Sequence, residues 1–87
     1  MSTKLPPEAI TLDNTQTNQV VEILRITEEG ERDPRLLDYL QKQHLIPGAR
    51  ITVQEVVEYT GVVTFTKDSK SIALGLKAAR TIWVKPV

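Results

Sequence analysis

His44 is the single histidine of the 87-residue sequence, and the acidic stretch EEGERD, which contains Glu31 and Asp33, lies shortly before it. An imidazole combined with carboxylate oxygens is a ligand set that suits iron or manganese. Glu31, Asp33 and His44 are therefore the candidate metal ligands. Each has a structural alternative, because a histidine at a helix end also binds a backbone carbonyl or carries a stabilising charge, and neighbouring carboxylates also form a solvated loop.

Aromatic side chains form the second candidate site, and Tyr59, Phe65 and Trp83 are the candidates for binding a protein or peptide. Trp83 alternates with apolar neighbours along an expected strand, so its indole should lie on the outer face and need a cover. Extended proline segments lose little entropy when they dock on aromatic rings. Pro6 and Pro7 could supply that cover, and the alternative is that the N-terminal segment or the helix covers Trp83 internally.

The sequence contains no arrangement typical of catalysis. It has no nucleophile turn with Ser, His and Asp, no glycine-rich phosphate loop and no carboxylate pair on an expected buried face. The 11 basic residues balance the 11 acidic ones, and only one helix of any length is expected, so we expect no direct contact with nucleic acid. We expect a non-enzymatic protein.

Cellular location follows from equally simple features. The sequence has no cysteine, which excludes disulfides and thiolate zinc sites and suits a reducing compartment. It has no apolar run long enough to cross a bilayer and no signal-peptide core. We therefore expect a cytoplasmic protein that does not insert into a membrane.

One short helix is expected over about residues 34–44. Asp33 can accept hydrogen bonds from the first free amides, and Pro34 lacks the amide that would remain unpaired there. Pro47 disfavours helical geometry at the preceding residue, and Gly48 can take the positive φ that a chain reversal needs. The segment HLIPG is thus expected to end the helix and direct the chain into a strand.

Five strands are expected, separated by turns at Gly30, Gly61 and the polar segment KDSK. Their approximate ranges are 20–26, 50–60 with a bulge near Gln54, 62–66, 71–76 and 81–87. So short an antiparallel sheet protects its edges most easily by curling into a small barrel. The expected fold is mainly β, a five-stranded barrel with one short helix, in which residues 1–18 form a proline-bearing linker and residues 19–87 form the domain.

Three segments, LLDYLQKQHLIPGARITV, SIALG and AARTIWV, together resemble the FeoA domain. That family has an apolar helix, a Gly-Leu-hydrophobic-Pro-Gly turn, an Ile-x-Val strand and a closing Ala-x-x-Ile-x-Val. The resemblance covers roughly Val20 to Val87 and implies an SH3-like barrel. His44 replaces the first glycine of the turn, so the helix is expected to run slightly further than in the family.

FeoA-like domains occur as small proteins in ferrous iron uptake and as C-terminal domains of DtxR-type metal-dependent repressors. ERDPRLLDYL resembles the helix start of the repressor domains, and KLPPEA resembles the linker that precedes them. The resemblance therefore implies that the partner is the metal-binding and dimerisation domain of the same repressor chain, or its proline-bearing linker. The alternative partner is a ferrous iron transporter, on whose cytosolic domain a free-standing FeoA protein would act.

The resemblance also bears on metal binding. Some of these repressors contribute a carboxylate and an amide, three residues apart at this helix start, to a site in the neighbouring domain. Asp33 stands near the acidic position, but Leu36 cannot coordinate a metal, and only Glu28, Glu29 or Glu31 could substitute. Hard cations need several oxygen ligands at once. We expect no tightly bound cofactor here, and only weak Fe²⁺ or Mn²⁺ binding in a full-length context.

Overall fold

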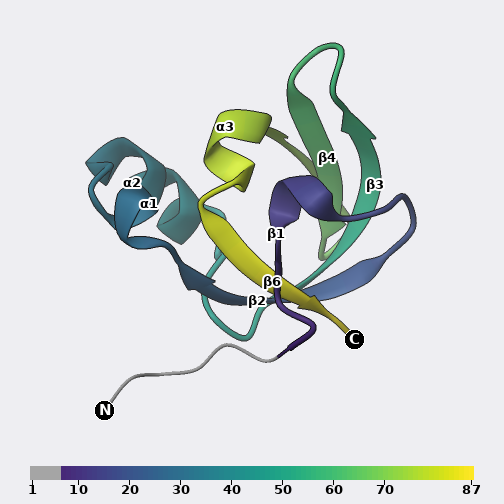
Figure 1. Ribbon diagram of the computed structural model, residues 1–87, viewed down its shortest axis with the longest axis horizontal. Coiled ribbons are helices and arrows are strands. Elements are labelled where there is room, and N and C mark those ends of the chain that lie inside the picture. The colour runs from purple at the N-terminus through teal and green to yellow at the C-terminus, as the bar shows by residue number, and fades with distance from the viewer. Residues whose placement is uncertain (1–6) are drawn as a thin grey trace.

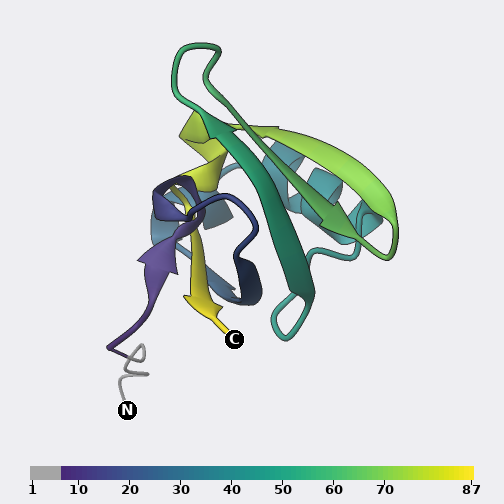
Figure 2. The same ribbon diagram turned by 90° about the vertical axis from the view of Figure 1, so that its right-hand side faces the viewer.

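The computed structural model describes residues 7–87, which form one antiparallel sheet with short helices at its ends (Figure 1). The strands are β1 (Ile10–Thr11), β2 (Val20–Ile26), β3 (Arg50–Val57), β4 (Val62–Lys67), β5 (Lys70–Gly75) and β6 (Ile82–Pro86). The helices are η1 (Leu12–Asn14), α1 (Glu28–Glu31), α2 (Pro34–Lys42) and α3 (Leu76–Ala79). The strand order is β1-β6-β2-β3-β4-β5, and Figure 2 shows how strongly the sheet curls. The mainly β fold is confirmed, with six strands where five were expected.

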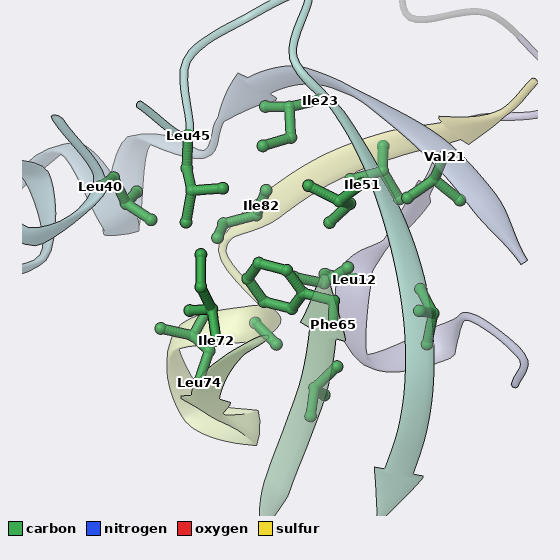
Figure 3. Close-up of a cluster of buried hydrophobic side chains, with 14 of the residues drawn as sticks. Leu12, Val21, Ile23, Leu40, Leu45, Ile51, Phe65, Ile72, Leu74 and Ile82 are labelled. Carbon is green, nitrogen blue, oxygen red and sulfur yellow. The ribbon is translucent and has the colours of Figure 1, made fainter. Parts of the chain in front are cut away.

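One apolar core fills the inside of the curled sheet (Figure 3). Phe65 is fully buried at its centre, and Leu40 and Leu45 approach Ile72 from the side of α2. Each of the strands β2 to β6 buries two residues that lie two positions apart, as the two-residue period of a strand requires, whereas both residues of β1 are half-buried. The continuous apolar run of β2 is not covered on both faces, because Val20 is 39% exposed and only Val21 and Ile23 are fully buried.

The expected boundary between residues 18 and 19 does not follow the packing. β1 pairs with β6, and Leu12 in η1 is only 1% exposed. The amide of Asn18 donates to the carbonyl of Val53 over 2.7 Å. The domain therefore includes the chain from residue 10 onward. Pro7 is exposed, and Pro6 lies outside the described residues.

Gly30 lies in a short helix, α1, where the sequence predicted only a turn. The side chain of Thr27 accepts from the amide of Gly30, which starts the turn. Gly30 is buried, and a Cβ built on it would lie 2.5 Å from Cγ2 of Ile26 and 2.8 Å from Cβ of Thr81. Glycine is needed here for the close approach of α1 to the sheet.

The start of α2 is as expected. Asp33 accepts from the amides of Arg35 and Leu36 at 3.1 and 3.3 Å, and Pro34 is the first helical residue. Both features satisfy or remove amides that would otherwise lack partners at a helix start. Residues 33 and 34 therefore fix where α2 begins.

The end of α2 differs from the expectation, because the helix ends at Lys42 and not at residue 44. His44 has a φ of 57° and its amide donates to the carbonyl of Gln41, while the amide of Leu45 donates to the carbonyl of Leu40 over 2.8 Å. This pair of bonds is the Schellman arrangement, in which the residue after the cap is usually glycine. His44 thus occupies the family's glycine position and adopts the conformation that glycine favours.

The other turn residues follow the expectations. Gly48 and Gly61 have φ values of 94° and 71°, which places both in the region that favours glycine. Asp68 and Ser69 both have positive φ between paired Lys67 and Lys70, which is a two-residue type I′ hairpin turn. The register of β3 against β4 shifts between Val53 and Glu55, where a bulge was expected.

We predict that Gly30→Ala destabilises the domain by about 1–3 kcal/mol, because the methyl group must displace Ile26 or Thr81 in a packed region. Urea denaturation would measure the change. Gly75→Ala is the matched control, since the nearest atom to its Cβ lies 3.9 Å away and its φ of −61° suits alanine. Equal midpoints for the two variants would contradict the close approach at Gly30.

We predict that His44→Gly stabilises the domain by about 0.5–1 kcal/mol, because relief of the left-handed strain exceeds the added freedom of the unfolded chain. Gln43→Gly is the control. Its φ is −90°, so glycine relieves nothing there and should lower the free energy of unfolding. Thermal melts of both variants would check the opposite signs, and destabilisation by both would mean that His44 is not strained.

Candidate functional site

The candidate metal ligands do not come together. Glu31 ends α1, Asp33 caps the start of α2, and His44 follows the other end of that helix. A nine-residue helix is about 13 Å long, so His44 is far from the carboxylates. Within residues 7–87, no group of three or more His, Cys, Asp or Glu side chains is placed to hold a metal ion.

Asp33 faces a small hollow whose lining includes Glu29 and Lys77, together with Gly30 and Thr81. One oxygen of Asp33 already accepts two amides of α2. The ammonium of Lys77 in the same hollow opposes a divalent cation by its charge. The geometry therefore assigns Asp33 a capping role in the domain by itself.

The aromatic candidates are also separated. Phe65 is fully buried in the core and cannot line a binding surface, so this assignment was wrong. Tyr59 is 91% exposed in the β3–β4 turn, at the end of the long hairpin in Figure 1. Trp83 is half-buried on β6, while its neighbours Ile82 and Val84 are buried, which agrees with the expected outward direction.

Trp83 pairs in register with Thr11 on one side and with Arg25 on the other. The part of the N-terminal segment beside Trp83 is thus β1. Pro7 lies several residues earlier and is exposed, while Pro6 is not described. The cover of the Trp83 indole by the N-terminal segment stays a prediction.

A cluster of basic side chains lies where α2 ends, and sequence reasoning missed it. His44 and Lys42 from the helix end face Lys67 and Lys70 from the β4–β5 turn across a hollow of about 160 Å³. A broader depression adjoins it and adds Arg50 from β3. These residues come from three segments far apart in the sequence, so no local motif could have identified the cluster.

The carboxylate of Asp68 lies within this cluster. The hydrogen bond from Nζ of Lys67, 2.9 Å long, lowers the pKa of Asp68 below its ordinary value, and the charge of Lys67 adds to the effect. His44 and Lys70 act in the same direction. The lowered pKa reflects a positive local field around an exposed acid.

An apolar hollow of about 250 Å³ lies on the other side of the HLIPG turn. Leu37 and Ile46 are the exposed aliphatic residues of its lining, at 37% and 51%. Ile26, Leu40, Leu45, Pro47 and Gln41 complete it.

In the part of the chain that the structure describes, no helix is long and apolar enough to cross a membrane.

The sequence matches the model of the FeoA domain family over residues 10–86. A comparison with curated proteins finds no match. Among solved structures, a manganese-dependent transcriptional repressor is similar with a TM-score of 0.83 and 27% identity, over 97% of this chain and 44% of that one. The chain therefore spans less than half the length of that repressor.

Two further structures share the fold. IdeR of T. acidophilum gives a TM-score of 0.80 at 22% identity, over 98% of this chain and 37% of its own. The iron uptake regulatory protein FeoA gives 0.72 at 18% identity, over 91% of this chain and 99% of its own. The family match begins at residue 10, where β1 begins, and extends through β6. The chain belongs to the FeoA domain family.

Proposed function

We propose that the chain is a non-enzymatic interaction domain in metal homeostasis, and that it serves as the C-terminal domain of a DtxR-type metal-dependent repressor. The observation that carries the proposal is the similarity to the manganese-dependent repressor, which extends over 97% of this chain but only 44% of that one. A domain of this kind acts through what it contacts. Its partner would be the metal-binding and dimerisation domain of the same chain, or the proline-bearing linker between them, in the cytoplasm.

The ligand geometry suits a supporting role in metal sensing. The carboxylates of α1, Glu28, Glu29 and Glu31, are exposed, and the hollow that Glu29 lines also contains Lys77, so a cation there would keep most of its water. Weak Fe²⁺ or Mn²⁺ binding would then require ligands from the neighbouring domain. A site shared in this way would couple metal binding to the contact between domains.

A second function is favoured by a different observation. The structure of FeoA matches over 99% of its own length, so a chain of this size can be a complete FeoA-type protein. In that case the domain would be a ferrous iron transport accessory that contacts the cytosolic domain of the transporter. The two proposals share an interaction domain and differ in its partner.

We predict that the reading frame upstream of the codon for Met1 encodes a helix-turn-helix and a metal-binding domain. In that full-length protein, removal of residues 10–87 should change the Mn²⁺ or Fe²⁺ concentration needed for half-maximal operator binding by about fivefold or more, as typical coupling energies imply. Fluorescence anisotropy with labelled operator would measure it. The control is Thr17→Ala, which alters an exposed turn outside the hollows described above and should leave the concentration unchanged.

An upstream frame without such domains would contradict the repressor assignment. Co-purification of the intact chain with the cytosolic domain of a ferrous iron transporter would then support the second function. A full-length repressor whose metal response is unaffected by removal of the domain would refute the proposed regulatory role.

A further inference from the structure

The basic cluster at the end of α2 forms a continuous groove, here called the basic groove. It consists of the hollow of about 160 Å³ and the adjoining depression, which share His44, Lys67 and Asp68. Its charged lining is Lys42, His44, Arg50, Lys67, Asp68 and Lys70. Four permanent cations therefore face a single carboxylate, in a chain with no net charge.

The cations of the groove are available to an anionic ligand. Lys42 and Arg50 are paired with Asp38 and Glu22 at 3.0 and 3.8 Å, but both cationic side chains are about 70% exposed. Exposed ion pairs contribute little free energy, so a partner carboxylate can compete for these cations. Lys70 forms no ion pair within the described residues.

The backbone holds the groove in shape before any ligand arrives. The Schellman turn fixes His44 at one wall, and the type I′ turn fixes Lys67 and Lys70 at the other. The side chain of Lys67 is only 15% exposed, so its aliphatic part is packed while its ammonium reaches Asp68. Less conformational entropy is lost on binding to such a preorganised surface.

The remaining lining favours a peptide over a nucleic acid. Ile46 and Pro47 supply exposed apolar surface along the groove, and no Phe, Tyr or Trp is among the described lining residues. Single-stranded nucleic acids usually need aromatic stacking, and duplex DNA is typically bound by chains with a net positive charge. Alternating acidic and apolar side chains would match both the cations and the apolar surface.

We propose that the basic groove binds an extended acidic segment of a partner protein, whose carboxylates contact Lys42, Lys67 and Lys70 while its apolar residues contact Ile46 and Pro47. The inference rests on the proposed role as an interaction domain and names the chemistry of the partner. The inference applies to both partners proposed above, because a segment of the repressor or of the transporter would bind to the same groove.

Fluorescence anisotropy tests the proposal on the intact chain. The probe is a fluorescein-labelled peptide of alternating glutamate and leucine, and the matched peptide has glutamine at each glutamate position. We expect the glutamate peptide to bind more tightly at low salt and to lose affinity as salt is raised. Lys42→Glu and Lys70→Glu should each weaken binding by about threefold to tenfold.

Lys77→Glu is the matched control, because it makes the same charge change at an exposed lysine of α3 outside the groove. It should leave the affinity within about twofold, the range of a weak remote charge effect. Thermal melts of the variants would show that all three retain the fold. Since the exposed positions 42, 70 and 77 are outside the core, the comparison is one of surface charge.

Equal affinity for the glutamate and glutamine peptides would overturn the proposal, as would equal losses for Lys70→Glu and Lys77→Glu. Tighter binding of a labelled DNA duplex, weakened by the groove variants alone, would replace the peptide by nucleic acid. These outcomes are separate from the regulatory test, because the groove can fail to bind an acidic peptide while removal of the domain still changes the metal response.

Discussion

The position of β6 between β1 and β2 is the constraint on which the rest of the structure depends. The last strand, β6, pairs with β1 near the N-terminus, where Ile10 lies opposite Val84. It also pairs with β2, where Ile26 lies opposite Ile82. This pairing closes the core over Ile82 and Val84, which are 1% and 0% exposed. The same end of the sheet holds the start of α1, since the amide of Thr27 donates to the carbonyl of Thr81 over 2.8 Å.

The strands β3, β4 and β5 are organised differently, because each pairs with its neighbour in sequence. Tight turns can specify such local pairings. The pairing of β6 with β1 and β2 instead costs the entropy of closing loops that contain most of the chain. Because the core is small, the domain is stable only when the β3–β5 pairings and the closure by β6 are both formed. The groove depends on this cooperation, since its walls belong to α2 and to the β4–β5 turn.

Local chemistry made much of the fold predictable from the sequence. Asp33 and Pro34 define the start of α2. Gly48 takes the positive φ expected of it, and Gly61 lies in a turn as expected. The two-residue β1 could not be recognised, because Ile10 and Leu12 are only two alternating apolar residues and the segment that follows them is polar. The burial of Phe65 and the basic groove depend on contacts between distant segments, which composition and spacing do not reveal.

His44 has a φ of 57°, which is uncommon for a residue other than glycine. Its Schellman turn is held by the bond from Leu45 to Leu40, and both of these leucines are buried. The packing of the two leucines thus stabilises a conformation that histidine would otherwise avoid. A glycine would satisfy the same turn with less strain, but it would remove an imidazole from the wall of the groove. The strained residue therefore lies on the wall of the basic groove, the surface that we propose binds an acidic segment.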